Sequence, residues 1–480
     1  MSTFFRNRAK NEHERAKKFK KQSQPIEQNA KEKRSAAKKV LNDSQLEELF
    51  DEAQAEKILK SLNQEQEQAA LSSNTHNLVI ASAGTGKTST IVTRVVHLLK
   101  QGTLPSNIML ITFTSKAAEE MRERIKKYIQ PQIANDILIG TFHSTAISLL
   151  KQNNISFNLQ MGGSLFSLFD LSYNKHTSAH PLNEGSYKSS SLFDMYSTFQ
   201  AKRKGRGFAE WFVETFPTRE NHFDSLEHYD TIFALHEELL ERENIVGFNE
   251  LLLFAKQNAH RFKNSFREII IDEYQDTSFL QTEYIEALSF KQLFCVGDYD
   301  QSIYAFNGAD ITIIGSFKNH YPHASVINLK KNYRSRKPIL ELAQKSISIN
   351  ERLFPKELEI TKMDDSIPVE HKIYETSEVQ YEEIANEIKN SSRNFNEIAV
   401  LYRNNSSADK IEVEFKNLDI NVIRDDKSSF FDIDEVRYTL NLLRLLSGSY
   451  KLSLIEISNT IMNPYLLKLK NSGIFTKLLT

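Results

Sequence analysis

Cysteine is almost absent from this 480-residue sequence, in which Cys295 is the only one. An internal disulfide is therefore excluded, which fits a reducing compartment. Because Cys295 lies in the apolar run LFCVGD, we interpret it as a buried structural thiol and not as a nucleophile. Apolar runs of the ~18 residues needed to cross a membrane are lacking, as is the apolar N-terminal segment of a signal peptide. These absences predict a soluble, cytoplasmic protein with no membrane partner.

Net charge is also nearly absent overall, at −1, but the charge is unevenly distributed. Residues 1–41 carry 13 Lys or Arg against 4 Glu, a net +9, which leaves about −10 for the remainder. A basic arm on a mildly acidic body suggests contact with a polyanion. A disordered, solvated tail explains the same composition, so both interpretations stay open.

Short apolar runs recur along the chain, and several are separated by segments with helical spacing. Runs of this length that are rich in Ile, Val and Leu read as buried parallel strands. In SKAAEEMRERIKKY, the residues Ala117, Met121 and Ile125 share one helical face. This alternation predicts an α/β fold with a doubly wound parallel sheet. The predicted strands are LVIA (78–81), IMLIT (108–112), ILIGT (137–141), EIIIDE (268–273), LFCVGD (293–298) and IAVLYR (398–403).

A phosphate-binding loop is indicated by ASAGTGKT (81–88), which lies between a strand and the helical segment STIVTRVVHLL. Such a loop needs backbone N–H groups, small residues and a lysine at the helix start, and Gly84, Gly86, Lys87 and Thr88 supply them. The usual pattern is G-x-x-x-x-G-K-[ST], in which the lysine reaches the β- and γ-phosphates and the hydroxyl binds Mg²⁺. Ala81 replaces the first glycine of that pattern.

Acidic residues end two of the predicted strands. Asp272 and Glu273 close EIIIDE, where they are suited to hold magnesium and to deprotonate an attacking water. Solvated strand ends also carry acidic residues, so the pair alone is ambiguous. A second acidic strand end, CVGDYDQS, adds Gln301 as a contact for a γ-phosphate.

Taken in order, the motifs resemble those of the UvrD/Rep/PcrA family of superfamily 1 DNA helicases over roughly residues 60–465. They are LNQEQ (62–66), ASAGTGKT (81–88), ITFTSKAAEEM (111–121), GTFHS (140–144), DEYQD (272–276), VGDYDQSIYAFNGAD (296–310) and NLKKNYRS (328–335). The resemblance implies a P-loop NTPase (RecA-like) sheet, ATP and Mg²⁺ as cofactors, and single-stranded DNA, or DNA with single-stranded tails, as the partner. Alanine is common at the first loop position in this family, so Ala81 fits it.

The resemblance assigns roles to individual residues of the nucleotide site. Lys87, Glu273, Gln301 and Arg334 would be catalytic, with Glu273 as the base and Arg334 as an arginine finger. Thr88 and Asp272 would hold the metal. ATP would be bound by Gln66, Ala83, Gly84, Thr85, Gly86, Lys87, Thr88, Ser89 and Tyr333.

The resemblance also implies a set of residues that face DNA: Thr112, Phe113, Lys116, Thr141, Phe142, His143, Tyr304 and Phe306. Aromatic rings suit this role because stacking on bases tolerates any sequence. The run AKRKGRGFAEWF (201–212) is a further candidate. For that run we favour an exposed loop followed by a helix whose aromatic residues face the core.

The chain departs from the family at several positions. Phe306 and Asn307 stand where the family has Trp-Arg, Gly247 replaces an aspartate in GFNELL, and Ile433 replaces an arginine in SFFDIDEV. We do not find the family's last motifs, and the final residues resemble the opening of its domain 2B. We therefore expect a truncated or split helicase, or its first part alone, with a complementing C-terminal chain or repair proteins as possible partners.

The domain organisation that follows has five parts. These are a basic arm (1–45), a RecA-like ATP-binding domain 1A (46–145 and 251–330), a mostly helical insertion 1B (146–250), a partial RecA-like domain 2A (331–450) and the start of 2B (451–480). The expected function is that of an ATP-dependent DNA helicase or translocase of the UvrD type, which binds single-stranded DNA, hydrolyses ATP and moves 3′–5′ in DNA repair or replication restart, with activity impaired by the truncation. A non-hydrolysing ATP- and DNA-binding module is the alternative, and an unrelated P-loop ATPase or nucleoside kinase is a third.

Overall fold

The computed structural model describes residues 52–424, apart from 161–162, 203–204, 264–265, 355 and 365–367, together with residue 443. It divides into two compact units, residues 1–365 and 366–480, which we describe separately. The basic arm, the segment SFFDIDEV and the proposed start of domain 2B lie outside the described residues. Within the described part, no helix is both long and apolar enough to cross a bilayer.

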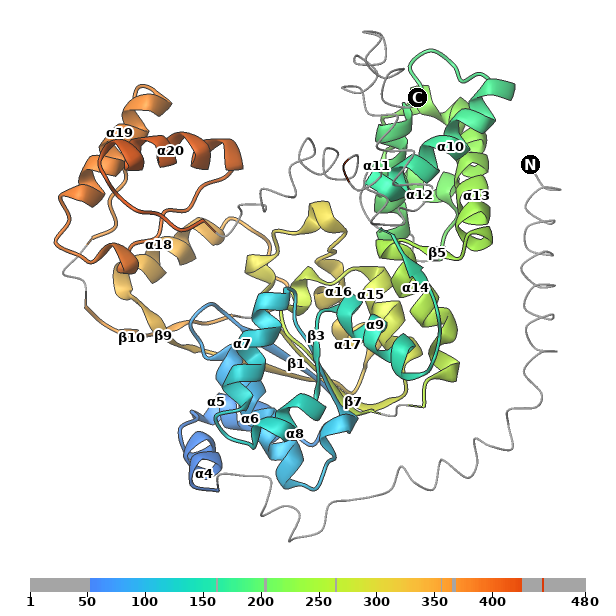
Figure 1. Cartoon of the computed structure of the whole chain (residues 1–480). Helices are drawn as coiled ribbons and strands as arrows, with labels where there is room; N and C mark the ends of the chain where they lie inside the picture. The colour runs from blue at the N-terminus through green and yellow to red at the C-terminus, as the bar shows by residue number, and fades with distance from the viewer. Residues whose placement is uncertain are drawn as a thin grey trace. The chain divides into compact units, whose positions relative to one another are not determined.

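A six-stranded sheet forms the centre of the first unit (Figure 1). Its order is β3-β2-β6-β7-β1-β8, and every neighbouring pair is parallel. The strands are β1 (His76–Ala81), β2 (Ile108–Ile111), β3 (Leu138–Gly140), β6 (Phe266–Ile271), β7 (Phe290–Gly297) and β8 (Ser325–Leu329). The predicted α/β fold with a parallel sheet is thus confirmed, and five of the six predicted strands are present.

The sheet is buried on both faces, which is why its strands are continuously apolar and do not alternate with polar residues. In β1, Leu78 and Ile80 belong to one core cluster, whereas Val79 and Ala81 belong to the other. One face is covered by α4 (Glu52–Lys60), α5 (Gln64–Ala70), α6 (Lys87–Lys100), α7 (Ser115–Ile125) and α8 (Pro131–Asp136). The other is covered by α9 (Phe142–Gln152), α14 (Phe248–Asn258), α15 (Phe279–Ala287), α16 (Thr312–Gly315) and α17 (Phe317–His320).

A buried ion pair fastens α6 to the centre of the sheet. Arg94 donates from Nε and Nη2 to the two carboxylate oxygens of Glu268 in β6, both at 2.7 Å. Its remaining nitrogen, Nη1, donates to the carbonyls of Ala70 and Ser72. Because the side chains of the pair are only 1% and 0% exposed, the guanidinium replaces water as the partner of the carboxylate.

The inserted region folds mainly as helices, as the sequence predicts. They are α10 (Gly163–Ala179), α11 (Ser189–Lys202), α12 (Phe208–Thr215) and α13 (Leu226–Arg242), flanked by the short parallel pair β4 (Asn158–Leu159) and β5 (Ile245–Val246). Their core is aromatic, and Phe208, Trp211 and Phe212 are all buried in it. The aromatic residues of AKRKGRGFAEWF therefore face the core, as we favoured, and do not form a surface for DNA.

The first unit ends with a short strand pair and a helix. β9 (Lys331–Arg336) pairs in parallel with β10 (Glu359–Lys362), and α18 (Lys337–Ile347) lies between them in the chain. Short 3₁₀ helices complete the connections: η2 (Pro105–Asn107), η3 (Glu220–Ser225), η4 (Ala259–Arg261), η5 (Tyr274–Asp276), η6 (Tyr299–Gln301) and η7 (Ala305–Asn307).

In its described residues, the second unit contains α19 (Ser377–Lys389), η8 (Phe395–Glu397) and α20 (Asn405–Asn417). Ala385, Ile411, Phe415 and Ile420 form its small core. The prediction of a strand at IAVLYR (398–403) is wrong for this structure, because no described segment pairs with that stretch and Leu401 is 94% exposed. An apolar run becomes a strand only where a neighbour accepts and donates its backbone hydrogen bonds.

Candidate functional site

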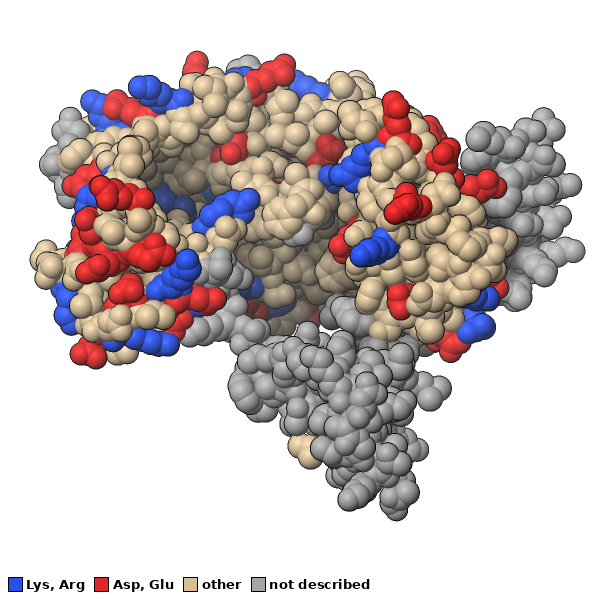
Figure 2. All heavy atoms as spheres, turned by 90° about the horizontal axis from the view of Figure 1, so that it is seen from above, with Lys and Arg blue, Asp and Glu red and all other residues tan. Residues whose placement is uncertain are grey.

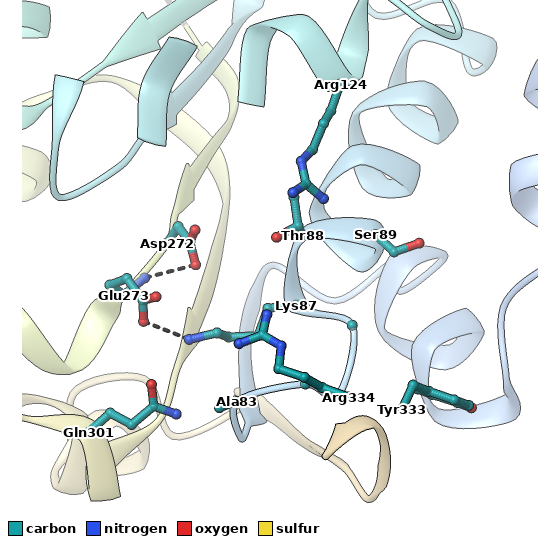
Figure 3. A pocket seen from close by; sticks show the side chains of 12 residues that line it. Ala83, Lys87, Thr88, Ser89, Arg124, Asp272, Glu273, Gln301, Tyr333 and Arg334 are labelled. Carbon is teal, nitrogen blue, oxygen red and sulfur yellow. Dashed lines mark hydrogen bonds and ion pairs between the residues drawn. The ribbon is translucent and has the colours of Figure 1, made fainter. Parts of the chain in front are cut away.

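A polar cavity of about 380 Å³ lies at the carboxyl ends of four sheet strands (Figure 3). Segments that follow β1, β6, β7 and β8 supply its walls, which is where parallel α/β sheets hold ligands. The lining residues are Ala83, Gly84, Gly86, Lys87, Thr88, Ser89, Arg124, Asp272, Glu273, Gln301, Tyr333 and Arg334. Of the predicted nucleotide-site residues, the structure therefore brings all but Gln66 and Thr85 to the wall of one cavity.

The loop after β1 has the backbone that phosphate binding requires. Gly84 and Gly86 adopt φ angles of +80° and +87°, in the left-handed region that favours glycine. α6 begins directly after Gly86, so its free N–H groups and the positive end of its dipole face the cavity. Ala81, in contrast, is the last residue of β1 and is fully buried in the core. Ala81 therefore belongs to the strand, and the left-handed turns come later, at Gly84 and Gly86.

Two segments distant in sequence, α5 and β9, form hydrogen bonds with the backbone of the loop. Gln66 donates from Nε2 to the carbonyl of Thr85 at 2.9 Å, and its Oε1 accepts the backbone N–H of Asn63. On the other side, Asn332 donates to the carbonyl of Ala83 at 2.6 Å. Gln66 and Thr85 are buried, so the role that the structure gives them is to fix the loop's shape.

Opposite the loop, the end of β6 presents the two predicted acidic residues. Lys87 Nζ lies 2.7 Å from Glu273 Oε2, so the loop lysine and the candidate base form an ion pair. Glu273 has a φ of +51°, which is uncommon for a residue other than glycine. Its N–H donates to Asp272 Oδ1 at 3.0 Å. This turn directs both carboxylates towards the cavity from consecutive positions (Figure 3).

The environment of Asp272 suits a divalent cation. Burial, followed by the charge of Glu273, raises the pKa of Asp272 to about 6, and Lys87 opposes the shift. A bound cation would offset both causes. Carboxylate and hydroxyl oxygens are the ligands that Mg²⁺ prefers, and the side chains of Asp272 and Thr88 line the same cavity. The residues therefore fit the metal that the sequence predicted.

A hydrogen-bonded chain links the end of β6 to the end of β7. Gln275 donates from Nε2 to Glu273 Oε2 at 3.0 Å and accepts from the N–H of Asp298 at 2.9 Å. Asp298 Oδ2 in turn accepts from Gln301 Nε2 at 2.6 Å. Gln301 thus lines the cavity with one amide N–H already engaged, which restricts the orientation of its side chain.

The remaining wall comes from β9 and α7. Tyr333 donates its backbone N–H to the carbonyl of Gly84, and its hydroxyl accepts from Asn63 Nδ2 at 2.9 Å. Its ring is 44% exposed, so it offers a stacking face beside the loop. Arg334 follows it into the cavity. Together with Lys87 and Arg124, Arg334 gives the cavity three cationic side chains, a charge suited to a polyphosphate.

Arg124 is the lining residue that the sequence reasoning missed. It lies in the last turn of α7, among several other basic residues of the same helix. Nothing in the sequence separates it from Arg122 or Lys126. Only the packing of α7 beside α6 brings it to the cavity edge.

The predicted DNA-facing residues divide into exposed and buried members. Phe113, Tyr304 and Phe306 form a row of rings, with centroids 4.3 Å apart for the first pair and 5.8 Å for the second. Phe306 is 77% exposed. Lys116 is also exposed, in the first turn of α7. The structure therefore brings the more exposed candidates of two motifs, ITFTSKAAEEM and VGDYDQSIYAFNGAD, together near the ends of β2 and β7.

Other members of the set are less accessible. Thr112 and Phe142 are buried at 1% and 6% exposure, and Phe142 packs in the core below the sheet. Thr141 uses its hydroxyl to cap α9. His143 stacks on Phe248 with ring centroids 3.5 Å apart, and burial lowers its pKa to about 4. Burial therefore removes Thr112 and Phe142 from the candidate DNA-facing set, and Phe248, which is 50% exposed, is a further candidate. Phe248 is part of GFNELL, so an aromatic residue was visible there in the sequence. From the sequence, we considered only the aspartate that this segment lacks.

Residues 62–322, which contain the ring row and every cavity-lining residue except Tyr333 and Arg334, match the family model described as the UvrD/REP helicase N-terminal domain. The chain belongs to the UvrD/REP helicase family. Residues 327–463 match the UvrD-like helicase C-terminal domain. The chain therefore carries sequence of that domain as well, and the expectation that it is the first part of the helicase alone is too narrow. That its last motifs are missing remains an expectation.

Relatives of this UvrD/REP chain include ATP-dependent DNA helicases PcrA from several bacteria. The protein of Staphylococcus epidermidis strain RP62A is 30% identical over 411 residues, which are 82% of this chain and 54% of the relative. That of Bacillus subtilis strain 168 is 31% identical over 405 residues, with the same two shares. That of Staphylococcus aureus strain Mu50 is 29% identical over 410 residues. The chain thus spans about half the length of these curated relatives.

Proposed function

We propose that this chain binds ATP with Mg²⁺ in the cavity, hydrolyses it, and couples the nucleotide to single-stranded DNA, as a UvrD-type helicase or translocase. One observation carries the proposal. A single cavity gathers a phosphate-binding loop, a pair of acidic residues, the engaged amide of Gln301 and the cation of Arg334. By resemblance to the family, we further propose 3′–5′ movement and a role in DNA repair or replication restart.

In the proposed site, each side chain has a distinct task. Lys87 and the N-terminus of α6 bind the β- and γ-phosphates, so Lys87 exchanges Glu273 for phosphate when ATP binds. Glu273 is then free to accept a proton from the attacking water. Asp272 and Thr88 would hold Mg²⁺, which would neutralise phosphate charge when bound. Gln301 orients groups at the γ-phosphate, and Arg334 stabilises the negative charge there.

The proposed DNA surface lies on the row of rings Phe113, Tyr304 and Phe306, with Lys116 nearby for the phosphate backbone. Each base stacked on a ring contributes ~1–3 kcal/mol and carries no sequence preference. Over the face drawn in Figure 2, basic side chains are interspersed with acidic ones. That face therefore shows no single concentrated area of positive charge among the described residues.

Lys87→Ala tests the proposed function directly. The substitution removes the phosphate-binding cation, and we expect DNA-stimulated ATP hydrolysis to fall by about 100-fold or more. Lys330→Ala is the matched control, because Lys330 forms an exposed ion pair with Glu357 and does not line the cavity. Steady-state ATPase with and without single-stranded DNA is the measurement. ATP binding without turnover in the wild-type chain would instead favour the non-hydrolysing module.

A further inference from the structure

Three residues that follow α18 grip the turn after β7, and we call them the clamp residues (Arg352, Phe354 and Lys356). Arg352 Nη1 lies 2.8 Å from both carboxylate oxygens of Asp300. Lys356 Nζ lies 2.5 Å from Asp298 Oδ1 and 2.5 Å from Asp300 Oδ2. The carbonyl of Phe354 accepts from the hydroxyl of Tyr299 at 3.0 Å. Every residue from Asp298 to Asp300 is therefore held from this one segment.

Lys356 is the central member of the clamp. Its side chain is 13% exposed, and those of Asp298 and Asp300 are 3% and 14% exposed. Two carboxylates so close together repel each other, and the ammonium group offsets that repulsion where water has little access. The ammonium also lies 5.1 Å from the centre of the Tyr299 ring, within the range of a cation–π contact. The ion pair of Lys356 with the two aspartates is therefore less screened by solvent than an exposed ion pair.

Asp298 joins this clamp to the nucleotide cavity. Its Oδ1 accepts from Lys356, while its Oδ2 accepts from Gln301 Nε2 at 2.6 Å. Its backbone N–H donates to Gln275, which contacts Glu273. The two oxygens of one nearly buried carboxylate are therefore shared between the clamp and the cavity. Without Lys356, Asp298 Oδ1 would keep only the N–H of Asp300, at 3.2 Å, so the carboxylate that holds the Gln301 amide would be less restrained.

We propose that Lys356 is a positioning residue that acts through Asp298 to hold the Gln301 amide in the orientation that distinguishes ATP from ADP. This inference rests on the proposed function, because it assigns a task to Gln301 in the same cavity. The clamp residues lie in the segment between α18 and β10, and β10 pairs with β9, the strand that carries Arg334. The chain after β8 thus reaches the cavity twice, directly with Arg334 and through Asp298 with Lys356.

The test measures nucleotide binding, so it does not depend on turnover. The ratio of the affinities for a non-hydrolysable ATP analogue and for ADP is determined in the wild-type chain, Lys356→Met, Gln301→Ala and the double variant. We expect Lys356→Met to lower this ratio about tenfold, the size of one lost hydrogen bond to a charged group. In the Gln301→Ala background, Lys356→Met should have no further effect on the ratio. Lys356→Arg should restore most of it.

Two controls separate a positioning role from a structural one. Lys330→Met removes the exposed ion pair with Glu357, next to Lys356 in the chain, and should leave the ratio unchanged. ADP affinity alone should also be unchanged in Lys356→Met, because Lys356 does not contact the phosphate-binding loop, which holds the β-phosphate that ADP keeps. An unaltered ratio in Lys356→Met overturns the inference, and so does an effect that adds fully to that of Gln301→Ala. Failure of the wild-type chain to bind either nucleotide would instead overturn the proposed function, and the inference with it.

Discussion

Gly84 shows how closely two parts of the nucleotide cavity approach each other. A Cβ atom at this position would lie 2.6 Å from the Cβ of Arg334 and 2.9 Å from Asn332 Nδ2. Its φ of +80° adds strain for any other residue. The close approach of Arg334 and Asn332 to the loop therefore requires that residue 84 has no side chain.

We expect Gly84→Ala to weaken ATP binding at least tenfold, because β9 must move away from the loop together with Arg334 and Tyr333. Gly185→Ala is the matched control: its φ is +92°, but a Cβ there meets nothing within 4 Å. Both variants bear the left-handed cost of ~1–2 kcal/mol in stability, but only the first should lose nucleotide affinity. Titration with a fluorescent ATP analogue measures the difference. Equal affinities for the two variants would contradict the close packing of β9 on the loop.

His236 is packed inside the inserted helices. It is fully buried, and neither ring nitrogen has a hydrogen-bond partner among the described residues. The ring packs against Phe169 and Tyr196, with centroids 5.2 Å and 5.4 Å away. Burial lowers its pKa from 6.5 to about 4, so the folded chain keeps this ring neutral.

This shift makes stability depend on pH in a defined window. Between pH 6.5 and 4, the unfolded chain binds a proton at His236 that the folded chain does not, so stability falls as the pH is lowered through this range. The loss approaches ~3 kcal/mol at the low end. His236→Phe should reduce the slope of unfolding free energy against pH, as measured by urea denaturation from pH 4.5 to 7. His143 shares the shift but contributes equally to both proteins, and identical slopes would exclude His236 as a cause.

At the scale of elements, the Arg94–Glu268 pair decides whether α6 stays fixed to the sheet. Arg94→Met leaves the Glu268 carboxylate buried without its partner, and we expect a loss of ~3–5 kcal/mol in unfolding free energy. Replacing both with apolar residues, as in Arg94→Met with Glu268→Leu, should cost less than Arg94→Met alone. Lys60→Met, which removes the exposed pair with Glu56, should change stability by less than ~1 kcal/mol. Chemical denaturation would contradict this account if the double variant proved the less stable.

The sequence correctly predicted strands of the central sheet that are buried on both faces. A strand buried on both faces is apolar throughout, so β1, β2, β3, β6 and β7 were all visible as short runs. The same signal failed at IAVLYR, because the run records a preference for burial, whereas a strand also needs partners. Arg124 was also not identified from the sequence as a cavity residue. Its place at the cavity depends on how two helices pack, and no local pattern of residues encodes that contact.

The residue types at the nucleotide site were predictable because their chemistry is local to the strand ends. The connections between them were not. Gln275 and Lys356 join segments far apart in the sequence. Gln275 lies within DEYQD, but its position there does not indicate its partner, and Lys356 lies in no recognised motif. The family resemblance indicated which residues line the cavity, and the structure adds the hydrogen bonds and ion pairs that hold them in place.

For the whole molecule, the distribution of charge separates the arm from the body. Residues 1–41 have a net charge of +9, whereas the chain totals −1. Deleting residues 1–41 should reduce the salt dependence of single-stranded DNA binding, since each phosphate that loses its contact removes ~0.7 from the slope of log K against log salt. Fluorescence anisotropy at several salt concentrations gives this slope. A slope that stays the same would assign the arm no part in DNA binding.

The position of Ala81 has a consequence for how phosphate loops are recognised in other genomes. Its Cβ is accommodated in the sheet's core, and the left-handed turns fall on Gly84 and Gly86, three and five residues further on. A search pattern that insists on glycine at the strand's last position discards sequences for a constraint that the backbone does not impose. A pattern anchored on the two turn glycines and the lysine would retain them.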